Sequence, residues 1–176
     1  MLLIYTHKVT PRLNFVFKQI FVRILKVPIS FTVEINDFIA HVGPKLTYSR
    51  KSLGNELFIK SHDLLFDQGV NDIEIKMNEW KNSPVFFFNN AKGDVPFDLF
   101  AASFYLLSRY EEYLPHVQDE NERFPASESL AYKNDFLSIP LVDVWAMKLR
   151  GILIEKFPDY NFPNREYNEI STIDVD

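Results

Sequence analysis

Two acidic residues close to the end of the chain, Asp174 and Asp176, have the spacing of a paired-carboxylate site. They follow apolar residues in the segment STIDVD, whose composition is typical of the end of a β-strand. On an extended backbone, side chains two residues apart point to the same side. One such carboxylate can then bind a metal ion while the other moves protons. The pattern also fits a polar tail, because acidic pairs of this kind are common.

A second group of polar side chains lies in the stretch with the strongest helical periodicity, FDLFAASFYLLSRYEEYL at residues 97–114. At about 100° per residue, Tyr105, Arg109 and Glu112 share one face of this helix, whereas Glu111 projects toward the apolar side. A buried carboxylate needs a partner, because an unpaired buried charge is costly. Either these four residues line a polar groove, or they form a solvated helix face with an ion pair to a neighbouring element. We favour the second interpretation.

Other patterns that carry chemistry are missing from the sequence. Its four histidines include no pair with the i, i+4 spacing that places two imidazoles around a metal on one helix face. The chain has no cysteine, which excludes disulfides, thiol catalysis and thiolate metal sites. It also has no Gly-x-Ser-x-Gly elbow and no glycine-rich phosphate loop. The residues alone therefore give no complete active site.

Length and composition are those of one ordinary domain. The chain has 176 residues, of which 47% are hydrophobic, so it can bury a sizeable core. Its net charge is −5 and it has no basic block, which argues against a nucleic-acid partner. No apolar run approaches the roughly 20 residues that a membrane span needs. The start, MLLIYTHKVTPRLN, lacks the features of a signal peptide, so we expect a cytoplasmic protein.

Hydrophobic periodicity predicts the elements that position these residues. We expect strands at residues 1–6, 31–35, 45–50, 56–60 and 84–88, with a shorter one at 73–75. We expect helices at residues 13–25, 97–114 and 141–157. Thr10 and Pro11 should begin the first helix, and Asp94 should cap the second. Residues 37–40 are expected to continue a hairpin, and Gly54 and Asn55 to form a turn before the next strand.

This order of elements predicts a single α/β domain, with α+β as the alternative, in which a mixed β-sheet is packed by about three helices. The polar residues 116–134 are expected to form a surface loop. Residues 159–169 read as a polar linker, and residues 170–176 as a strand that has only begun.

The segment STIDVD at residues 171–176 resembles the first motif of the polysaccharide deacetylase superfamily of metal-dependent carbohydrate esterases. The upstream chain is similar to an uncharacterised N-terminal domain that precedes such deacetylase domains in some bacterial proteins. The similar stretches are YTHKVTPRLNFVFKQIF, DLFAASFYLLSRYEEYLP and residues 136–157. The resemblance implies that Asp174 is the general base and that Asp176 is a ligand of a divalent metal such as zinc.

The sequence departs from that family in one respect. The family completes its metal site with a His-x-x-x-His pair, and the 176 residues contain none, so we expect no cofactor in this part of the protein. The resemblance implies that residues 1–158 are a non-catalytic accessory domain, that residues 159–169 are a linker, and that residues 170–176 begin a deacetylase domain that continues in the parent protein, itself a hydrolase. The accessory domain would position that deacetylase domain, contribute to binding a polysaccharide or support dimerisation. The alternative is an independent protein-interaction or ligand-binding module, and a stand-alone hydrolase ranks last.

Overall fold

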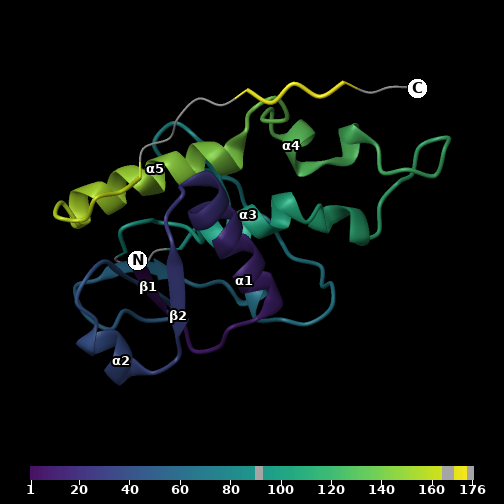
Figure 1. Cartoon of the computed structure of the whole chain (residues 1–176). Coiled ribbons are helices and arrows are strands. Elements are labelled where there is room, and N and C mark those ends of the chain that lie inside the picture. The colour runs from purple at the N-terminus through teal and green to yellow at the C-terminus, as the bar shows by residue number, and fades with distance from the viewer. Residues whose placement is uncertain (90–92, 164–168, 174–176) are drawn as a thin grey trace.

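A parallel β-sheet forms the base of the computed structural model, which describes residues 1–89, 93–163 and 169–173 (Figure 1). Its four strands have the order β2-β1-β3-β4. They are β1 (Leu2–Tyr5), β2 (Ile29–Thr32), β3 (Lys45–Ser49) and β4 (Leu57–Lys60). Strand β1 lies inside the sheet and reads LLIY, as expected for a parallel strand that is covered on both faces.

The first helical segment begins where the sequence indicates. The Thr10 hydroxyl accepts a hydrogen bond from the Leu13 N–H at 3.1 Å, and Pro11 occupies the first turn of α1 (Pro11–Phe17). The segment continues as the π-helix η1 (Lys18–Ile24), which the periodicity did not reveal. The predicted apolar stripe is buried and packs over the sheet.

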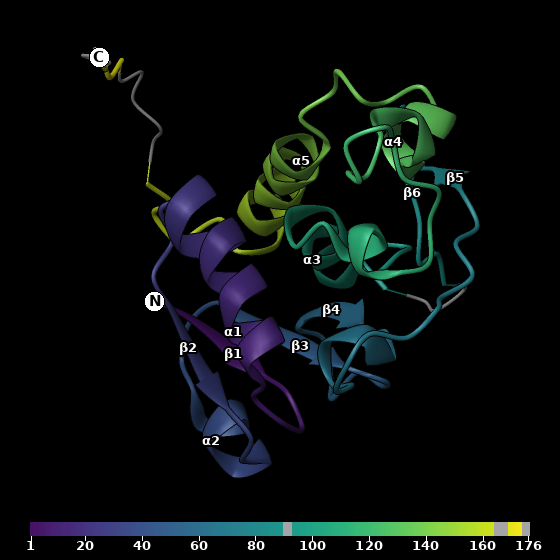
Figure 2. The same ribbon diagram turned by 90° about the vertical axis from the view of Figure 1, so that its right-hand side faces the viewer.

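Two further helices complete the core on this side of the sheet (Figure 2). The α3 helix (Leu99–Leu107) inserts Phe100, whose ring stacks on Phe17 at 3.8 Å between ring centroids. The predicted helix at 141–157 is confirmed as α5 (Leu141–Lys156), which packs on η1 and α3. Its Trp145 is fully buried and donates a hydrogen bond to the Pro84 carbonyl at 3.1 Å.

The other face of the sheet carries one correction to the sequence predictions. The prediction that residues 37–40 continue a hairpin is wrong, because α2 (Ile35–Ala40) forms there and buries Phe38 against Tyr5. The predicted turn at 54–55 lies in the connection between β3 and β4, which are parallel. Residues 50–56 return along the sheet, and the Glu56 carboxylate holds them by accepting hydrogen bonds from Thr47 and from the Leu53 N–H, at 2.6 and 2.8 Å.

The central helix is shorter than the predicted 97–114. It ends at Leu107, Arg109 adopts a left-handed conformation with φ of 52°, and the 3-10 helix η3 (Tyr110–Tyr113) follows. This turn lets Tyr110 become buried and exchange hydrogen bonds with the backbone of Asn71 at 2.8 and 3.2 Å. A tertiary contact therefore overrides the local helical pattern.

The N-cap of α3 is also different from the prediction. Asp98 caps the helix, accepting hydrogen bonds from the N–H groups of Phe100 and Ala101 at 3.0 and 2.9 Å. Asp94 instead accepts a hydrogen bond from the Phe58 N–H at 3.0 Å and pairs with Lys156 at 2.9 Å. The two carboxylates thus connect α3 and α5 to the sheet.

The remaining elements are short. The expected strand at 84–88 is realised only as β6 (Pro84–Val85), which pairs antiparallel with β5 (Asn78–Glu79), and residues 73–75 form no strand. The predicted loop 116–134 contains the 3-10 helix η4 (Ala126–Glu128) and α4 (Leu130–Lys133), and the 3-10 helix η2 (Asp63–Leu65) follows β4. The prediction of a single α/β domain is confirmed, with a parallel main sheet and a separate antiparallel pair.

The end of the chain follows the domain closely at first. Phe162, in the first part of the predicted linker, is buried. Residues 170–173, the described part of the predicted final strand, are exposed and form no strand, because none of the described strands pairs with them. Throughout the described ranges, no helix is long and apolar enough to cross a membrane.

Candidate functional site

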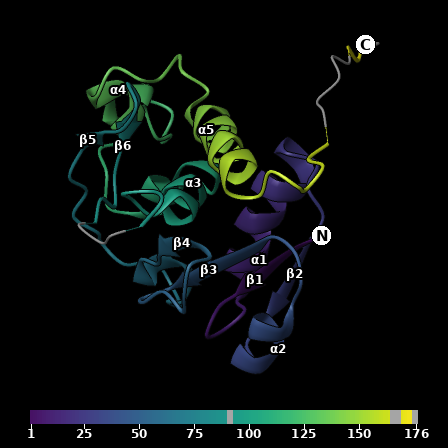
Figure 3. The same ribbon diagram turned by 90° about the vertical axis from the view of Figure 1, so that its left-hand side faces the viewer.

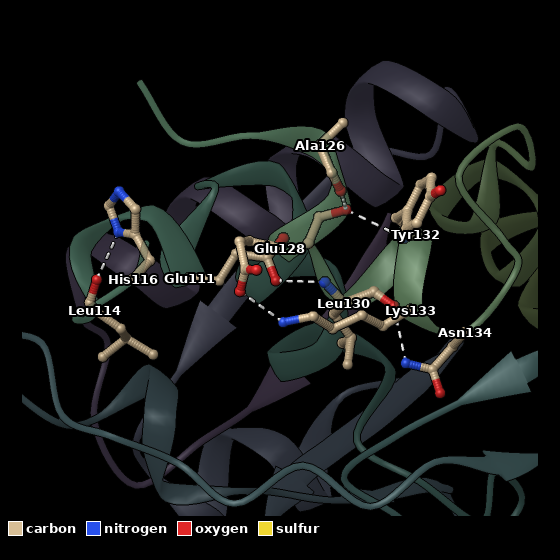
Figure 4. Close-up of polar contacts among 10 residues, drawn as sticks. Glu111, Leu114, His116, Ala126, Glu128, Leu130, Tyr132, Lys133 and Asn134 are labelled. Atoms are coloured by element: carbon tan, nitrogen blue, oxygen red, sulfur yellow. Dashed lines mark hydrogen bonds and ion pairs between the residues drawn. The ribbon is translucent and has the colours of Figure 1, made fainter. Parts of the chain in front are cut away.

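The turn that ends α3 places Glu111 beneath α4 (Figure 4). Its Oε2 atom accepts a hydrogen bond from the Leu130 N–H at 2.8 Å. The first N–H groups of a helix have no partner within the helix. The Ser129 hydroxyl accepts a hydrogen bond from another of these groups, the Tyr132 N–H, at 3.1 Å. Glu111 and Ser129 together therefore satisfy the start of α4.

A cavity of about 240 Å³ opens beside Glu111. It brings together polar side chains that are distant in the sequence, namely Asp72, Tyr105, Glu111, His116, Glu128 and Lys133. Small-molecule sites usually measure about 300–1,000 Å³, so this cavity is small for a ligand. Of the four residues predicted to line a groove, Tyr105 and Glu111 line this cavity.

Arg109 and Glu112 lie elsewhere. Arg109 is exposed, and its Nε atom forms an ion pair with Glu112 three residues on. Because the helix ends before Arg109, the single face that joins it to Tyr105 does not exist. The predicted four-residue groove is thus divided into two cavity-lining residues, the buried Tyr105 and the half-buried Glu111, and a surface ion pair.

Burial changes the acidity of Tyr105 and Glu111. It raises the pKa of the Glu111 carboxyl, while the hydrogen bond from Leu130 lowers it. Burial also raises the pKa of the Tyr105 hydroxyl, and the nearby charge of Glu111 adds to that increase. A carboxyl group with a raised pKa in a cavity is a candidate general acid.

The polar side chains around the cavity are nevertheless bonded to other groups of the same domain. Glu111 binds the Leu130 N–H at 2.8 Å, and the His116 Nδ1 atom lies 2.8 Å from the Leu114 carbonyl oxygen. Glu128 pairs with Lys133 at 2.9 Å. We therefore assign Glu111 a structural role, which is to hold α4 against the end of α3.

We expect Glu111→Ala to lower the free energy of unfolding by about 1–3 kcal/mol, because it leaves the Leu130 N–H without its acceptor. The matched control is Arg109→Ala, which removes an exposed ion pair and should cost about 1 kcal/mol or less. Urea denaturation of both variants measures the two changes. Equal losses would contradict the structural role of Glu111.

Asp174 and Asp176, the predicted carboxylate pair, lie outside the described residues. Two carboxylates alone do not make a zinc site, which needs three or four protein ligands. Within the part of the chain that the structure describes, no group of three or more His, Cys, Asp or Glu residues could hold a metal ion.

Sequence reasoning did not assign Asp72, Glu128 or Lys133 to this cavity. Asp72 lies far from the central helix in the sequence, and residues 116–134 were expected to be a plain loop. One local signal was available, because Ser129 precedes the helical run LAYK and is a favourable N-cap residue. Nothing local indicates that this short helix packs over Glu111.

Comparison with known families adds one match. A model described as a family of unknown function, DUF7033, matches residues 2–158. The match extends from β1 to the end of α5. No curated protein and no solved structure matches the chain.

Proposed function

We propose that this chain, which belongs to the family of unknown function DUF7033, is a non-catalytic accessory domain that positions a carbohydrate deacetylase domain in its parent protein. The observation that carries this proposal is the segment STIDVD at residues 171–176, which resembles the first deacetylase motif and follows the family domain closely. In this proposal Asp174 is the general base, and Asp176 binds a divalent metal such as zinc. Sequence beyond Asp176 supplies the histidine ligands.

The path of the chain after α5 supports a positioning role (Figure 3). Phe162 is buried, and the Arg150 guanidinium donates a hydrogen bond to the Pro163 carbonyl at 3.2 Å. The Tyr160 hydroxyl accepts a hydrogen bond from the N-terminal ammonium group of Met1 at 2.9 Å. These contacts hold the chain against the domain up to Pro163.

Apolar side chains are exposed beside this part of the chain. Ile39 and Val42 are 65% and 96% exposed. Val42 and Phe157 line a cavity of about 360 Å³, and Ile39 and Phe157 line a neighbouring one of about 370 Å³. We call Ile39, Val42, Phe157 and Pro158 the exit surface. Exposed apolar groups that lie together commonly mark interaction sites, and we propose that the deacetylase domain contacts this one.

The exit surface can be tested in the parent protein with Val42→Asp. We expect the deacetylase rate to fall about tenfold or more, which corresponds to an increase of about 1.4 kcal/mol in the activation free energy. The matched control is Val117→Asp, at a valine that is 71% exposed and outside the exit surface. Calorimetry should show that each variant folds, because substitutions at exposed sites change stability by only about 0.5 kcal/mol. Equal rates for the two variants would contradict docking at the exit surface.

A second candidate function is an independent ligand-binding module. A cavity of about 640 Å³ at the carboxyl ends of β1 and β3 favours it, because its volume is typical of ligand sites. The sequence of the parent gene separates the two candidates. A His-x-x-x-His pair after Asp176 is expected for the accessory domain, and a reading frame without one would favour the independent module.

A further inference from the structure

The cavity of about 640 Å³ lies where the connections of the parallel sheet diverge. Strand β1 leads to β2 on one side of it, and β3 leads to β4 on the other. In open parallel sheets, ligands bind outside the carboxyl ends of strands at such a switch point. The cavity is lined there by Tyr5 and His7, at and just after the end of β1, and by Ser49 and Arg50, at and just after the end of β3. We call it the carboxyl-edge crevice.

Aromatic rings form one wall of the carboxyl-edge crevice. The His7 ring packs on Phe66 with 4.2 Å between ring centroids, and both side chains line the crevice. Tyr5 also lines the crevice, but its ring packs on Phe38 of α2, on the other face of the sheet. Phe66 also packs against the buried Tyr48, which anchors it to the core. This wall offers an aromatic surface that is anchored to the core through Tyr48. Such a surface suits a ring-shaped ligand with an apolar face.

Charged side chains line the same crevice. Arg50 pairs with Asp63 at 2.8 Å, and their side chains are 73% and 59% exposed, so water can compete for the pair. Asp67 and Lys51 also line the crevice. Two cationic side chains, Arg50 and Lys51, thus stand against two carboxylates. The balance of charge favours a neutral ligand with many hydroxyl groups over an anion.

The groups that bind phosphate in other folds of this kind are already engaged. Phosphates usually bind the free N–H groups at the first helix N-terminus. Here the Thr10 hydroxyl accepts from the Leu13 N–H at 3.1 Å, and Pro11 has no N–H to donate. Arg12 donates to the carbonyl groups of Leu64, at 2.9 Å, and of Gly69. The site is therefore poorly suited to a nucleotide or a free phosphate.

We propose that the carboxyl-edge crevice binds a neutral oligosaccharide. One sugar ring lies on the wall formed by His7 and Phe66, and its hydroxyl groups exchange hydrogen bonds with Arg50 and Asp63. This inference goes beyond the proposed function, because it requires only this chain. The crevice lies at the carboxyl end of β3, whereas Val42 of the exit surface lies shortly before β3 begins, at the opposite end of that strand.

The test is an NMR titration of the 176-residue chain with hexa-N-acetylchitohexaose, cellohexaose and maltohexaose, and separately with inorganic phosphate and AMP. At least one oligosaccharide should bind with a Kd below about 1 mM. Its amide shifts should concentrate at residues 5–8, 49–51 and 63–67. Phosphate and AMP should produce no saturable shifts there. Absence of binding by all three oligosaccharides, shifts confined to another surface, or preferential binding of AMP in the crevice would each overturn the proposal.

Arg50→Ala provides the residue-level test, with Arg23→Ala as the matched control. Both arginines are exposed, and Arg23 lies on η1, outside the crevice. Arg50→Ala should weaken oligosaccharide binding about tenfold or more, and Arg23→Ala should leave it unchanged. Equal affinities would contradict the assigned role of Arg50. Because no deacetylase is present in this titration, its failure is distinguishable from a failure of the proposed accessory function.

Discussion

Replacing Asp98 with alanine is expected to lower the free energy of unfolding by about 3–5 kcal/mol. The Asp98 side chain is buried, and it accepts hydrogen bonds from four groups. Two come from the first turn of α3, and the others come from the Tyr48 hydroxyl at 2.7 Å and the His62 N–H at 2.6 Å. Alanine would remove the cap and leave two buried donors without an acceptor. Urea denaturation at about pH 5, below the pKa of the folded-state carboxyl, measures this loss, and a change below about 1 kcal/mol would contradict the prediction.

The same residue makes stability depend on pH. Burial raises the pKa of Asp98 from 3.8 to about 6, against the opposing effect of its hydrogen bonds. The folded state therefore holds its proton more tightly than the unfolded state. This contribution is fully present below about pH 4 and is lost as the pH rises through about 6. From about pH 4 to 7 the protein should lose up to about 3 kcal/mol relative to Asp98→Asn, which does not titrate. A difference between the two proteins that does not change with pH would contradict this assignment.

The second large effect is expected in the parent protein. If Asp174 is the general base that the deacetylase resemblance implies, Asp174→Asn should lower the deacetylase rate by about 100-fold or more. Asp159→Asn is the matched control, because Asp159 is an exposed aspartate just after α5. Initial rates of acetate release at saturating substrate measure both. Equal rates for Asp174→Asn and the control would show that Asp174 does not act as the base.

Elements with a complete local signal could be predicted. Thr10 and Pro11 mark the start of α1, and the apolar stripe that follows predicted η1 as well, although not its π-helical winding. The end of the α5 helix was predicted to within one residue, because Pro140 and Pro158 flank a segment with a clear helical periodicity of apolar residues. In these segments the local propensity and the tertiary packing favour the same structure.

Elements that depend on distant partners could not be predicted. The chain leaves the helical path at Arg109 because Tyr110 bonds to Asn71, and no local pattern around Arg109 reveals that contact. Residues 50–56 contain a turn signal that is typical of a hairpin, yet Thr47 and Glu56 hold them along a parallel pair of strands. Strand direction is therefore decided by long-range contacts.

The candidate sites also depend on residues that are distant in the sequence. The sequence indicated that Glu111 needs a partner, but the Leu130 N–H that binds it lies on a short helix within a segment expected to be a loop. The carboxyl-edge crevice was not predicted, because His7 and Arg50 come together only through the strand order of the sheet. The carboxylate pair is different, since its assignment rests on a sequence resemblance alone.

This domain is proposed to be a non-catalytic partner of a metal-dependent deacetylase domain in the same protein. The most direct test measures bound zinc and acetate release from hexa-N-acetylchitohexaose, for the purified parent protein and for the 176-residue chain side by side. We expect stoichiometric zinc and acetate release for the parent protein, and neither for the shorter chain. A parent protein without metal and without activity, or a 176-residue chain that binds zinc tightly and releases acetate, would contradict it.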